Sequence, residues 1–324
     1  MIYKPLIIVL GEPYSTFQEI ILKSIKKKIL SNYNIPIVFI GSVDLFTKQM
    51  KKLGYSYKIN VIEPDYLGKK KINNKFINFI NINFKTKKIF DKISFKSKSY
   101  IKNSFEMAIK LIRNKKVSGI INGPISKKHF LNKKFPGITE YLSKKAFAKS
   151  YPVMLIFNKK LSVSPITTHE PLKNVHKNIN RKKIIKNVTI INKFYIEKLK
   201  KKPLIAILGL NPHCETNSKF SEEEKIIVPS IKSLLKRKIR IDGPFSADTF
   251  FFKKNIKKYD VVVGMYHDQV LVPIKTLFNF DAINITLGLP FLRVSPDHGI
   301  GEDIVKKNKA NPESLIESIN FFKK

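Results

Sequence analysis

The feature that most constrains the fold is a repeated alternation between short apolar runs and longer amphipathic segments. The apolar runs have the length of buried strands, and the longer segments carry apolar residues at helical spacing. The strand-length runs are 5–11, 35–41, 117–123, 153–158, 161–167, 203–210, 259–265 and 282–288. The helical segments are 15–30, 43–53, 99–114, 139–148, 181–200, 222–236 and 312–322. This alternation predicts an α/β architecture built on a largely parallel sheet.

The length of 324 residues, of which 43% are hydrophobic, permits a sizeable core, and we expect two lobes. We place one lobe at about 1–130 plus the C-terminal segment and the other at about 131–285, with boundaries that interleave. The Asn-, Lys- and Phe-rich segment 68–97 has weak periodicity, and we interpret it as a variable excursion.

The cellular setting is predicted from the cysteine content and the apolar runs. Cys214 is the only cysteine, which excludes an internal disulfide and fits a reducing compartment. The first apolar run stops at 11–13 and is too short for a signal-peptide core. No apolar run approaches the ~20 residues that a membrane span needs. We therefore expect a soluble, cytoplasmic protein without a membrane partner.

The net charge of +38 raises the question of nucleic-acid binding. The lysines are spread over the whole chain together with many isoleucines and asparagines, which are the residues that AT-rich codons supply. No zinc knuckle, recognition-helix signature or arginine-rich stripe accompanies them. We interpret the lysines as solvated surface that attracts anionic small molecules, and we expect no specific nucleic-acid partner.

Three of the six histidines follow predicted strands, at the sheet edge where ligands bind in α/β proteins. His169 follows the run 161–167, His213 follows 203–210, and His267 follows 259–265. If they converge, they can bind one divalent metal and leave a coordination position for a substrate. From the spacing alone, general acid–base work or a purely structural role stays open.

Carboxylates and cations near these strand ends are further candidates. Asp248 follows a Gly-Pro turn and is either an N-cap or a functional carboxylate. Asp268 can orient the neighbouring imidazole or accept a proton. Lys275 and Arg293 flank the strand that carries Asn284, where they form either a cradle for an anion or ordinary surface charge. No Gly-x-Gly-x-x-Gly motif follows a strand, so a Rossmann dinucleotide site is not indicated.

A collinear series of motifs runs through most of the chain. They are GEP (11–13), GIINGPISK (119–127), PGITEYL (136–142), TTHEPL (167–172), GLNPH (209–213), GPFSADT (243–249) and GMYHDQVLVPIKTLFNFDAINITLGLPFLRVSPDHGIGED (264–303). In this order they resemble the 4-hydroxythreonine-4-phosphate dehydrogenase family of pyridoxal 5′-phosphate (vitamin B6) biosynthesis. The resemblance implies one family domain over 1–324 with an isocitrate/isopropylmalate-dehydrogenase-like fold, in which two α/β/α lobes flank a cleft. It also implies a homodimer with the active site at the subunit interface.

The resemblance assigns roles to individual positions. Metal ligands, supplied from both subunits, are His169, His213 and His267. Substrate contacts are Thr139, Lys275, Asn284 and Arg293, and the catalytic candidates are Asp248, Asp268 and Lys275. The segment 297–312, which contains His298 and Gly299, resembles the cofactor loop of the decarboxylating dehydrogenases, which bind NAD without a Rossmann fingerprint. NADP is open, as is the choice among Zn, Mg and Co.

The implied reaction is NAD-dependent oxidation of the substrate's C3 hydroxyl to a ketone, followed by loss of CO2 to give 3-amino-2-oxopropyl phosphate. The residue types suit this chemistry, because a bound metal stabilises alkoxide-like and enolate-like charge. Lys275 and Arg293 would neutralise substrate anions, and Asp248 or Asp268 would assist proton removal. The sequence does not decide between these two aspartates.

Several positions depart from the family pattern. Ile138 stands where the family has a histidine that contacts the substrate, and Glu215 is an acidic residue displaced by one position. The N-terminal GEPYSTFQE lacks glycines of the family motif, and DHGIG replaces DHGTA. We expect an active enzyme. One alternative is a dehydrogenase for erythronate or threonate 4-phosphate, and another is a non-catalytic binding relative, with nucleic acid as a candidate partner.

Overall fold

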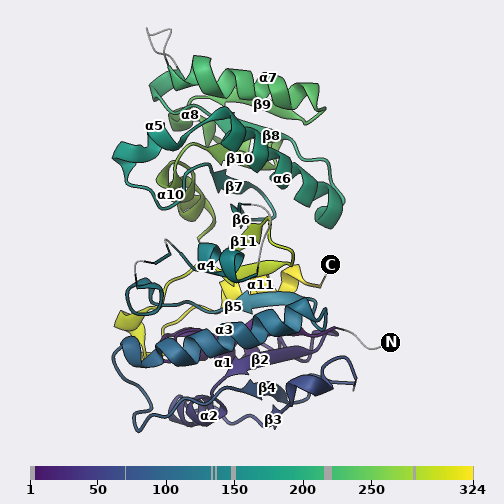
Figure 1. Cartoon of the computed structure of the whole chain (residues 1–324), viewed down its shortest axis with the longest axis vertical. Coiled ribbons are helices and arrows are strands. Elements are labelled where there is room, and N and C mark those ends of the chain that lie inside the picture. Colours follow the sequence, from purple (N-terminus) through teal and green to yellow (C-terminus); the bar gives the residue numbers. More distant parts are fainter. Residues whose placement is uncertain are drawn as a thin grey trace. The chain divides into compact units, whose positions relative to one another are not determined.

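The computed structural model describes residues 4–69, 71–132, 134–135, 137–146, 151–214, 221–279 and 282–323. The chain divides into two compact units. Unit 1 comprises Met1–Lys149 and Leu289–Lys324, and unit 2 comprises Ser150–Gly288. In Figure 1, unit 1 runs from purple through blue to teal and includes the yellow C-terminal segment, whereas unit 2 runs from teal through green to yellow-green.

The strands of unit 1 are all parallel. They are β1 (Leu6–Val9), β2 (Ile37–Gly41), β3 (Ile59–Val61), β4 (Ile77–Asn81), β5 (Gly119–Asn122) and β12 (Arg293–Pro296), in the order β3-β4-β2-β1-β5-β12. Every residue of β1, β2 and β5 is buried, as expected for a parallel sheet covered on both faces. The C-terminal segment returns to this sheet, where Arg293 of β12 lies opposite Ile120 of β5.

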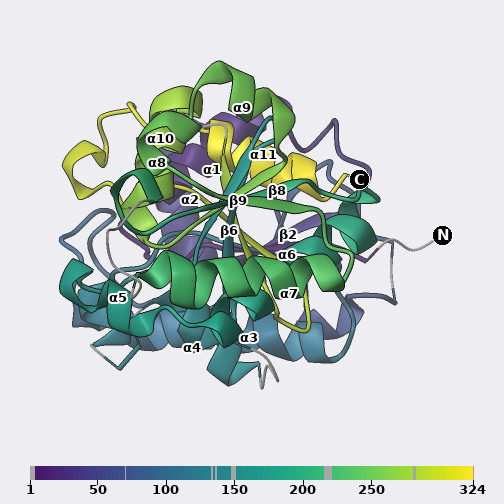
Figure 2. The ribbon, with the colours of Figure 1, turned by 90° about the horizontal axis from the view of Figure 1, so that it is seen from above.

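Helices cover both faces of the unit 1 sheet. The α-helices are α1 (Phe17–Lys26), α2 (Val43–Lys52), α3 (Lys98–Arg113), α4 (Ile138–Lys145) and α11 (Glu313–Phe321). Shorter helical turns are η1 (Pro64–Tyr66), η2 (Phe95–Ser97), η3 (Lys127–Leu131) and η7 (Glu302–Ile304). Figure 2 shows α1, α2 and α11 on one side of the strands and α3 and α4 on the other. Ser42 caps α2 by accepting a hydrogen bond from the Leu45 amide at 3.3 Å, which explains where this helix begins.

Unit 2 has a mixed sheet. Its strands are β6 (Val153–Phe157), β7 (Ser162–Pro165), β8 (Ile205–Leu208), β9 (Ile241–Phe245), β10 (Val261–Gly264) and β11 (Ile283–Leu287), in the order β11-β6-β7-β10-β8-β9. Strand β6 is antiparallel to both of its neighbours, and the pairs from β7 to β9 are parallel. Strands β7, β8 and β10 are buried over their whole length.

The helices of unit 2 also lie on both sides of its strands. They are α5 (Val175–Asn178), α6 (Arg181–Leu199), α7 (Val228–Lys236), α8 (Ala247–Phe250), α9 (Lys253–Lys258) and α10 (His267–Phe278), with the turns η4 (Leu172–Asn174), η5 (Pro212–Cys214) and η6 (Glu223–Ile227). Figure 2 shows α6 and α7 on one side and α8, α9 and α10 on the other. No helix in the described part of the chain is long and apolar enough to span a bilayer.

The predicted α/β architecture with a largely parallel sheet is confirmed, and each predicted strand and helix overlaps an observed one. The interpretation of 68–97 as an excursion was wrong for 77–81, because β4 pairs with β2 and β3 inside the sheet. Its polar Asn78 is buried, and its side chain donates to the carbonyls of Ile37 and Asn73. These hydrogen bonds satisfy the side-chain amide of Asn78, so a strand that contains asparagines can still be buried.

Candidate active site

The three histidines that follow predicted strands lie after neighbouring parallel strands of unit 2. Strand β10 pairs with β7 on one side and with β8 on the other. His169 follows β7, His213 lies in η5 after β8, and His267 is the first residue of α10 after β10. The carboxyl ends of parallel neighbours meet at one edge of a sheet. The sequence prediction of a common edge is therefore confirmed.

His169 and His267 lie close to each other. Their ring centres are 6.0 Å apart, with an angle of 37° between the ring planes. The Nδ1 atom of His267 is 2.6 Å from the Asp268 carboxylate, so Asp268 orients this ring. A carboxylate accepts hydrogen bonds, so Nδ1 donates to it, and in the neutral form of the ring Nε2 is the nitrogen that can bind a ligand.

His213 lies beside the other candidate aspartate. Its side chain is 72% exposed, and its Nδ1 atom is 3.9 Å from Oδ2 of Asp248. Asp248 is the second residue of α8, so the reading of Asp248 as the N-cap was wrong: Ser246 occupies that position. The Ser246 hydroxyl donates to Asp248 at 2.5 Å, and this hydrogen bond is the main cause of the lowered pKa of Asp248.

Within the described residues, no group of three or more His, Cys, Asp or Glu side chains is placed to hold a metal ion. The chain thus brings together His169 with His267, and His213 with Asp248, as two separate pairs. The three-histidine metal site stays a prediction.

Two of the predicted substrate contacts belong to unit 2. Lys275 is exposed on α10. Asn284 lies on β11, as the sequence predicts, and its Oδ1 atom is buried without a hydrogen-bond partner among the described residues. A buried acceptor without a partner costs free energy unless a ligand or water supplies a donor.

The other two substrate contacts meet in unit 1. Arg293, on β12, is 1% exposed, which contradicts the surface-charge alternative. Its Nε donates to Oδ1 of Asn122 at 2.7 Å, and Nη1 donates to the Thr139 hydroxyl at 3.2 Å. Burial lowers the pKa of Arg293 to about 10, although Glu140 favours its charged form. A guanidinium held this deeply, among oriented acceptors, is suited to a ligand anion.

Of the two single-residue departures from the family pattern, the structure describes one, Ile138. Ile138 is the first residue of α4 and packs, half-buried, against the apolar core of unit 1. The side chain of Ile138 therefore contributes to the apolar packing of unit 1. Glu215, the displaced acidic residue, lies outside the described residues.

The predicted cofactor residues lie in the loop before η7 in unit 1. The His298 ring is 6.0 Å from Phe17, and burial lowers its pKa. Its Nδ1 donates to the Gly299 carbonyl at 3.0 Å, whereas Nε2 is buried and no described residue hydrogen-bonds to it. Gly299 has open space where a Cβ would lie. The glycine that this loop requires is Gly301, which has φ +61°.

A buried carboxyl group that the sequence gave no reason to single out lies beside this loop. Glu12, after β1, is fully buried, and neither of its carboxylate oxygens makes a well-formed hydrogen bond to another described residue. Burial raises its pKa to about 7; the nearby Ser97 side chain and Ser126 backbone oppose this rise, and the negative charge of Glu302 adds to it. A motif as short as GEP carries no sign of such burial.

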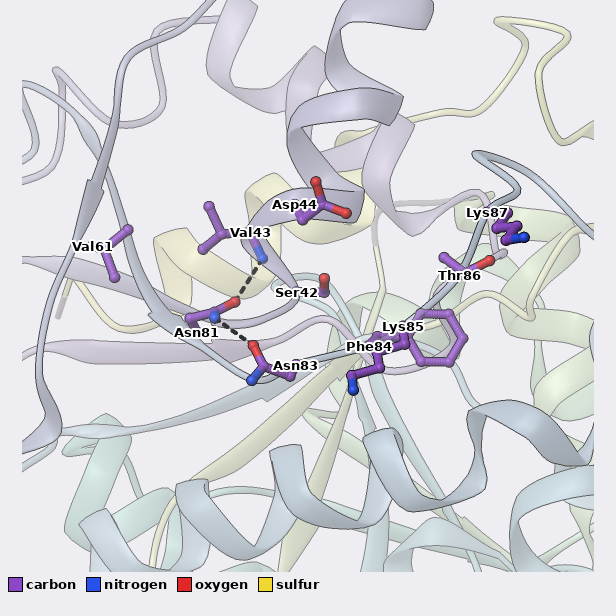
Figure 3. Close-up of a pocket in the computed structure, with 10 residues that line it drawn as sticks. All are labelled: Ser42, Val43, Asp44, Val61, Asn81, Asn83, Phe84, Lys85, Thr86 and Lys87. Atoms are coloured by element: carbon purple, nitrogen blue, oxygen red, sulfur yellow. Dashed lines mark hydrogen bonds between the residues drawn. The ribbon is translucent and has the colours of Figure 1, made fainter.

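Unit 1 also has a pocket of about 950 Å³ at the carboxyl ends of β2 and β4. Figure 3 shows Asn81 at this pocket, where it accepts from the Val43 amide and donates to Asn83. Lys85 and Lys87 line another part of it. None of the sequence-predicted site residues lines this pocket.

Comparisons with known proteins agree with the resemblance. The family model for "Pyridoxal phosphate biosynthetic protein PdxA" matches residues 32–322. A 4-hydroxythreonine-4-phosphate dehydrogenase from Sulfurihydrogenibium sp. (strain YO3AOP1) is 41% identical over 98% of this chain and 96% of its own length. A D-threonate 4-phosphate dehydrogenase from Pectobacterium atrosepticum is 36% identical over 63% of this chain and 64% of its own length.

Solved structures show the same fold. The crystal structure of 4-hydroxythreonine-4-phosphate dehydrogenase from Klebsiella pneumoniae has a TM-score of 0.83 and 28% identity, over 99% of this chain and 97% of that one. A β-decarboxylating dehydrogenase from Thermococcus kodakarensis, 13% identical, has a TM-score of 0.52 over 98% of this chain and 82% of that one, and this likeness concerns the fold alone. The expected dehydrogenase-like fold is confirmed, and the chain belongs to the family of the pyridoxal phosphate biosynthetic protein PdxA.

Proposed function

We propose that this protein is an NAD-dependent dehydrogenase that oxidises 4-phosphooxy-L-threonine at C3. The resulting β-keto acid loses CO2 and gives 3-amino-2-oxopropyl phosphate, for vitamin B6 biosynthesis in the cytoplasm. The observation that carries the proposal is the approach of His169 and His267 at the carboxyl edge of β7 and β10, in a chain 41% identical to a relative with this name.

A divalent metal fits the donors at this edge. An imidazole that binds zinc through one nitrogen places its ring centre about 3.2 Å from the metal, so two such rings on one tetrahedral zinc lie about 5.2 Å apart. The ring centres of His169 and His267 are 6.0 Å apart, within about 1 Å of that separation. Asp268 on Nδ1 of His267 is the carboxylate that typically orients a metal-binding histidine.

The third ligand, His213, would come from a second copy of the chain. His213 belongs to no group of three potential ligands among the described residues of one chain. In a homodimer with a shared active site, His169 and His267 of one subunit would be completed by the same His213 position of its neighbour. This arrangement would require the dimer that the family resemblance implies.

A nicotinamide dinucleotide fits the loop that contains His298. The buried Nε2 of His298 is an acceptor without a partner, and Gly299 beside it is exposed with space around its Cα. A ribose hydroxyl or a carboxamide N–H of the cofactor would supply the missing donor. When bound, the cofactor accepts a hydride and the metal acts as a Lewis acid toward the reacting oxygen.

The side chains of this protein would supply binding charge and a base. Arg293 and Lys275 would neutralise substrate anions, and Asn284 would offer its Oδ1, which has no partner among the described residues, to a substrate donor. As the hydride leaves C3, the hydroxyl proton passes to Asp268 or Asp248. The carbon–carbon bond to the carboxylate then breaks, CO2 departs, and the electron pair is taken up by the new ketone as an enolate, which is protonated at carbon.

A related substrate is the second candidate, because one relative is a D-threonate 4-phosphate dehydrogenase. Initial rates of NADH formation should be measured with both compounds under identical conditions. We expect kcat/KM for 4-phosphooxy-L-threonine to exceed that for D-threonate 4-phosphate at least tenfold, because a site built to bond an amino group discriminates against a hydroxyl. The reverse preference would assign the protein to threonate phosphate.

A further inference from the structure

Gln269 is a buried polar residue that the proposed reaction does not use. It is the third residue of α10, two positions after His267, and is 9% exposed. Its Oε1 accepts from the Met265 amide at 2.6 Å, and its Nε2 donates to the Gly209 carbonyl at 2.8 Å. One side chain thus connects the end of β10 to the end of β8.

We propose that Gln269 is a positioning residue that fixes the loops of His267 and His213 relative to each other. The inference rests on the proposed function, because each histidine needs a fixed position at the sheet edge only if it holds a metal, His267 in the site of its own subunit and His213 in that of the neighbouring subunit. Each loop leaves its strand within a few residues of the bonded atom: His267 lies two residues after Met265, and His213 lies four residues after Gly209. The carboxamide is therefore close to where both loops begin.

The backbone of Met265 connects the loop of His169, which follows β7, to the hydrogen bonds made by Gln269. Its carbonyl accepts from the Thr167 hydroxyl at 2.7 Å and from the Thr167 amide at 3.1 Å. Thr167 is 1% exposed and lies two residues before His169. The N–H of Met265 thus bonds to Gln269 while its C=O bonds to Thr167, so the loops after β7, β10 and β8 share one buried set of hydrogen bonds.

The loop of His213 is held on its other side by Glu223. This buried carboxylate accepts from the Leu210 amide at 2.7 Å, the Asn211 amide at 2.9 Å and the Asn211 side chain at 2.8 Å. Such charge-assisted bonds are among the stronger ones in proteins. His213 itself has φ 57°, a left-handed conformation that is uncommon for a residue other than glycine. The loop therefore has a defined path that Gln269 and Glu223 maintain together.

The chemistry of these bonds is specific for glutamine. A backbone N–H can only donate and a carbonyl can only accept, so the bridge needs one acceptor and one donor on the same side chain. Glutamate lacks the donor and would place a carboxylate oxygen against the Gly209 carbonyl. The fit is also tight: a Cβ at Gly264 would lie 2.8 Å from Oε1 of Gln269. Methionine fills the space of Gln269 without either bond.

The test compares the affinity of the full-length protein for Zn²⁺ alone in Gln269→Met and in a control, Gln49→Met. Gln49 is also buried, at 1% exposure, and donates to the backbone carbonyls of Pro13 and Ile89 in unit 1. We expect Gln269→Met to raise the Kd for Zn²⁺ about 10- to 100-fold, as loss of a residue that orients metal ligands typically does. Gln49→Met should leave the Kd within about twofold of the parent value.

A second readout needs no metal. Amide hydrogen exchange of the metal-free protein should accelerate at Met265 and Leu210 in Gln269→Met and stay at the parent rate there in Gln49→Met. Unchanged exchange at both amides, or an unchanged Kd in a folded variant, would overturn the positioning role. If the parent neither binds Zn²⁺ nor oxidises the substrate, the proposed function fails, and the exchange rates still decide the role of Gln269.

If Gln269→Met does not fold, Thr167→Val provides the same test from the other side of Met265. This variant keeps Gln269 and removes only the hydroxyl that bonds to the Met265 carbonyl. We expect a weaker Zn²⁺ affinity and faster exchange at Met265. Parent values of both quantities in Thr167→Val would contradict the network.

Discussion

Replacing His267 by alanine is expected to lower kcat/KM by about three orders of magnitude or more, since a Lewis acid supplies several kcal/mol of transition-state stabilisation. His267 is half-buried at the start of α10 and faces both His169 and Asp268. Its removal would take away one proposed metal ligand and leave Asp268 without the ring that it orients. Initial rates of NADH formation at saturating metal would measure the loss.

The matched control for this change is His176→Ala. His176 is an exposed histidine of α5 in the same unit. It does not follow any of the strands that carry the candidate histidines. Its replacement should therefore leave kcat/KM within about twofold of the parent value, as is usual for surface substitutions. Equal activity of His267→Ala and His176→Ala would place the active site elsewhere.

Replacing Glu12 by glutamine is expected to stabilise the protein by about 3 kcal/mol at pH 8 and by much less at pH 4. The Glu12 carboxyl is fully buried, and its pKa rises from 4.5 to about 7 on folding. Between these two values the unfolded chain loses its proton while the folded chain keeps it, so the folded state becomes less stable as the pH rises. Glutamine is a neutral isostere of the protonated acid and avoids this loss.

The measurement is the free energy of unfolding of parent and variant from urea titrations at several pH values. The difference between the two should grow from pH 4 to pH 7 and then level off. Glu19→Gln is the matched control: Glu19 is also buried on the N-terminal side of unit 1, but it pairs with Lys23 at 2.9 Å and accepts from the Ala310 amide. Its replacement should destabilise the protein, and a pH-independent difference for Glu12→Gln would contradict the raised pKa.

The sequence was informative wherever a signal is local. Apolar runs such as 259–265 predict buried strands because the burial of a parallel strand leaves a continuous hydrophobic pattern. The placement of His169 and His267 at one sheet edge followed from topology, because parallel strands end at the same edge. The specific roles of Thr139 and Arg293 came from the family resemblance, and their hydrogen bond joins residues 154 positions apart in the sequence.

The signals that the sequence did not carry are those set by tertiary contacts. Strand β4 contains Asn78, whose burial depends on carbonyls of other segments. Helix α10 begins at His267, directly after the apolar run 259–265. It contains Pro273, a residue that is unfavourable inside a helix, so the sequence did not predict it. The bridge made by Gln269 requires knowledge of where Gly209 lies. No local sequence pattern indicates hydrogen-bond partners that are so distant in the chain.

The stoichiometry of the reaction tests the central claim most directly. Purified protein should be incubated with 4-phosphooxy-L-threonine, NAD and a divalent metal, and NADH and CO2 should be measured in the same sample. An oxidation that is followed by decarboxylation predicts equal amounts of NADH and CO2, with 3-amino-2-oxopropyl phosphate as the organic product. The absence of NADH, or NADH without CO2, would contradict the account.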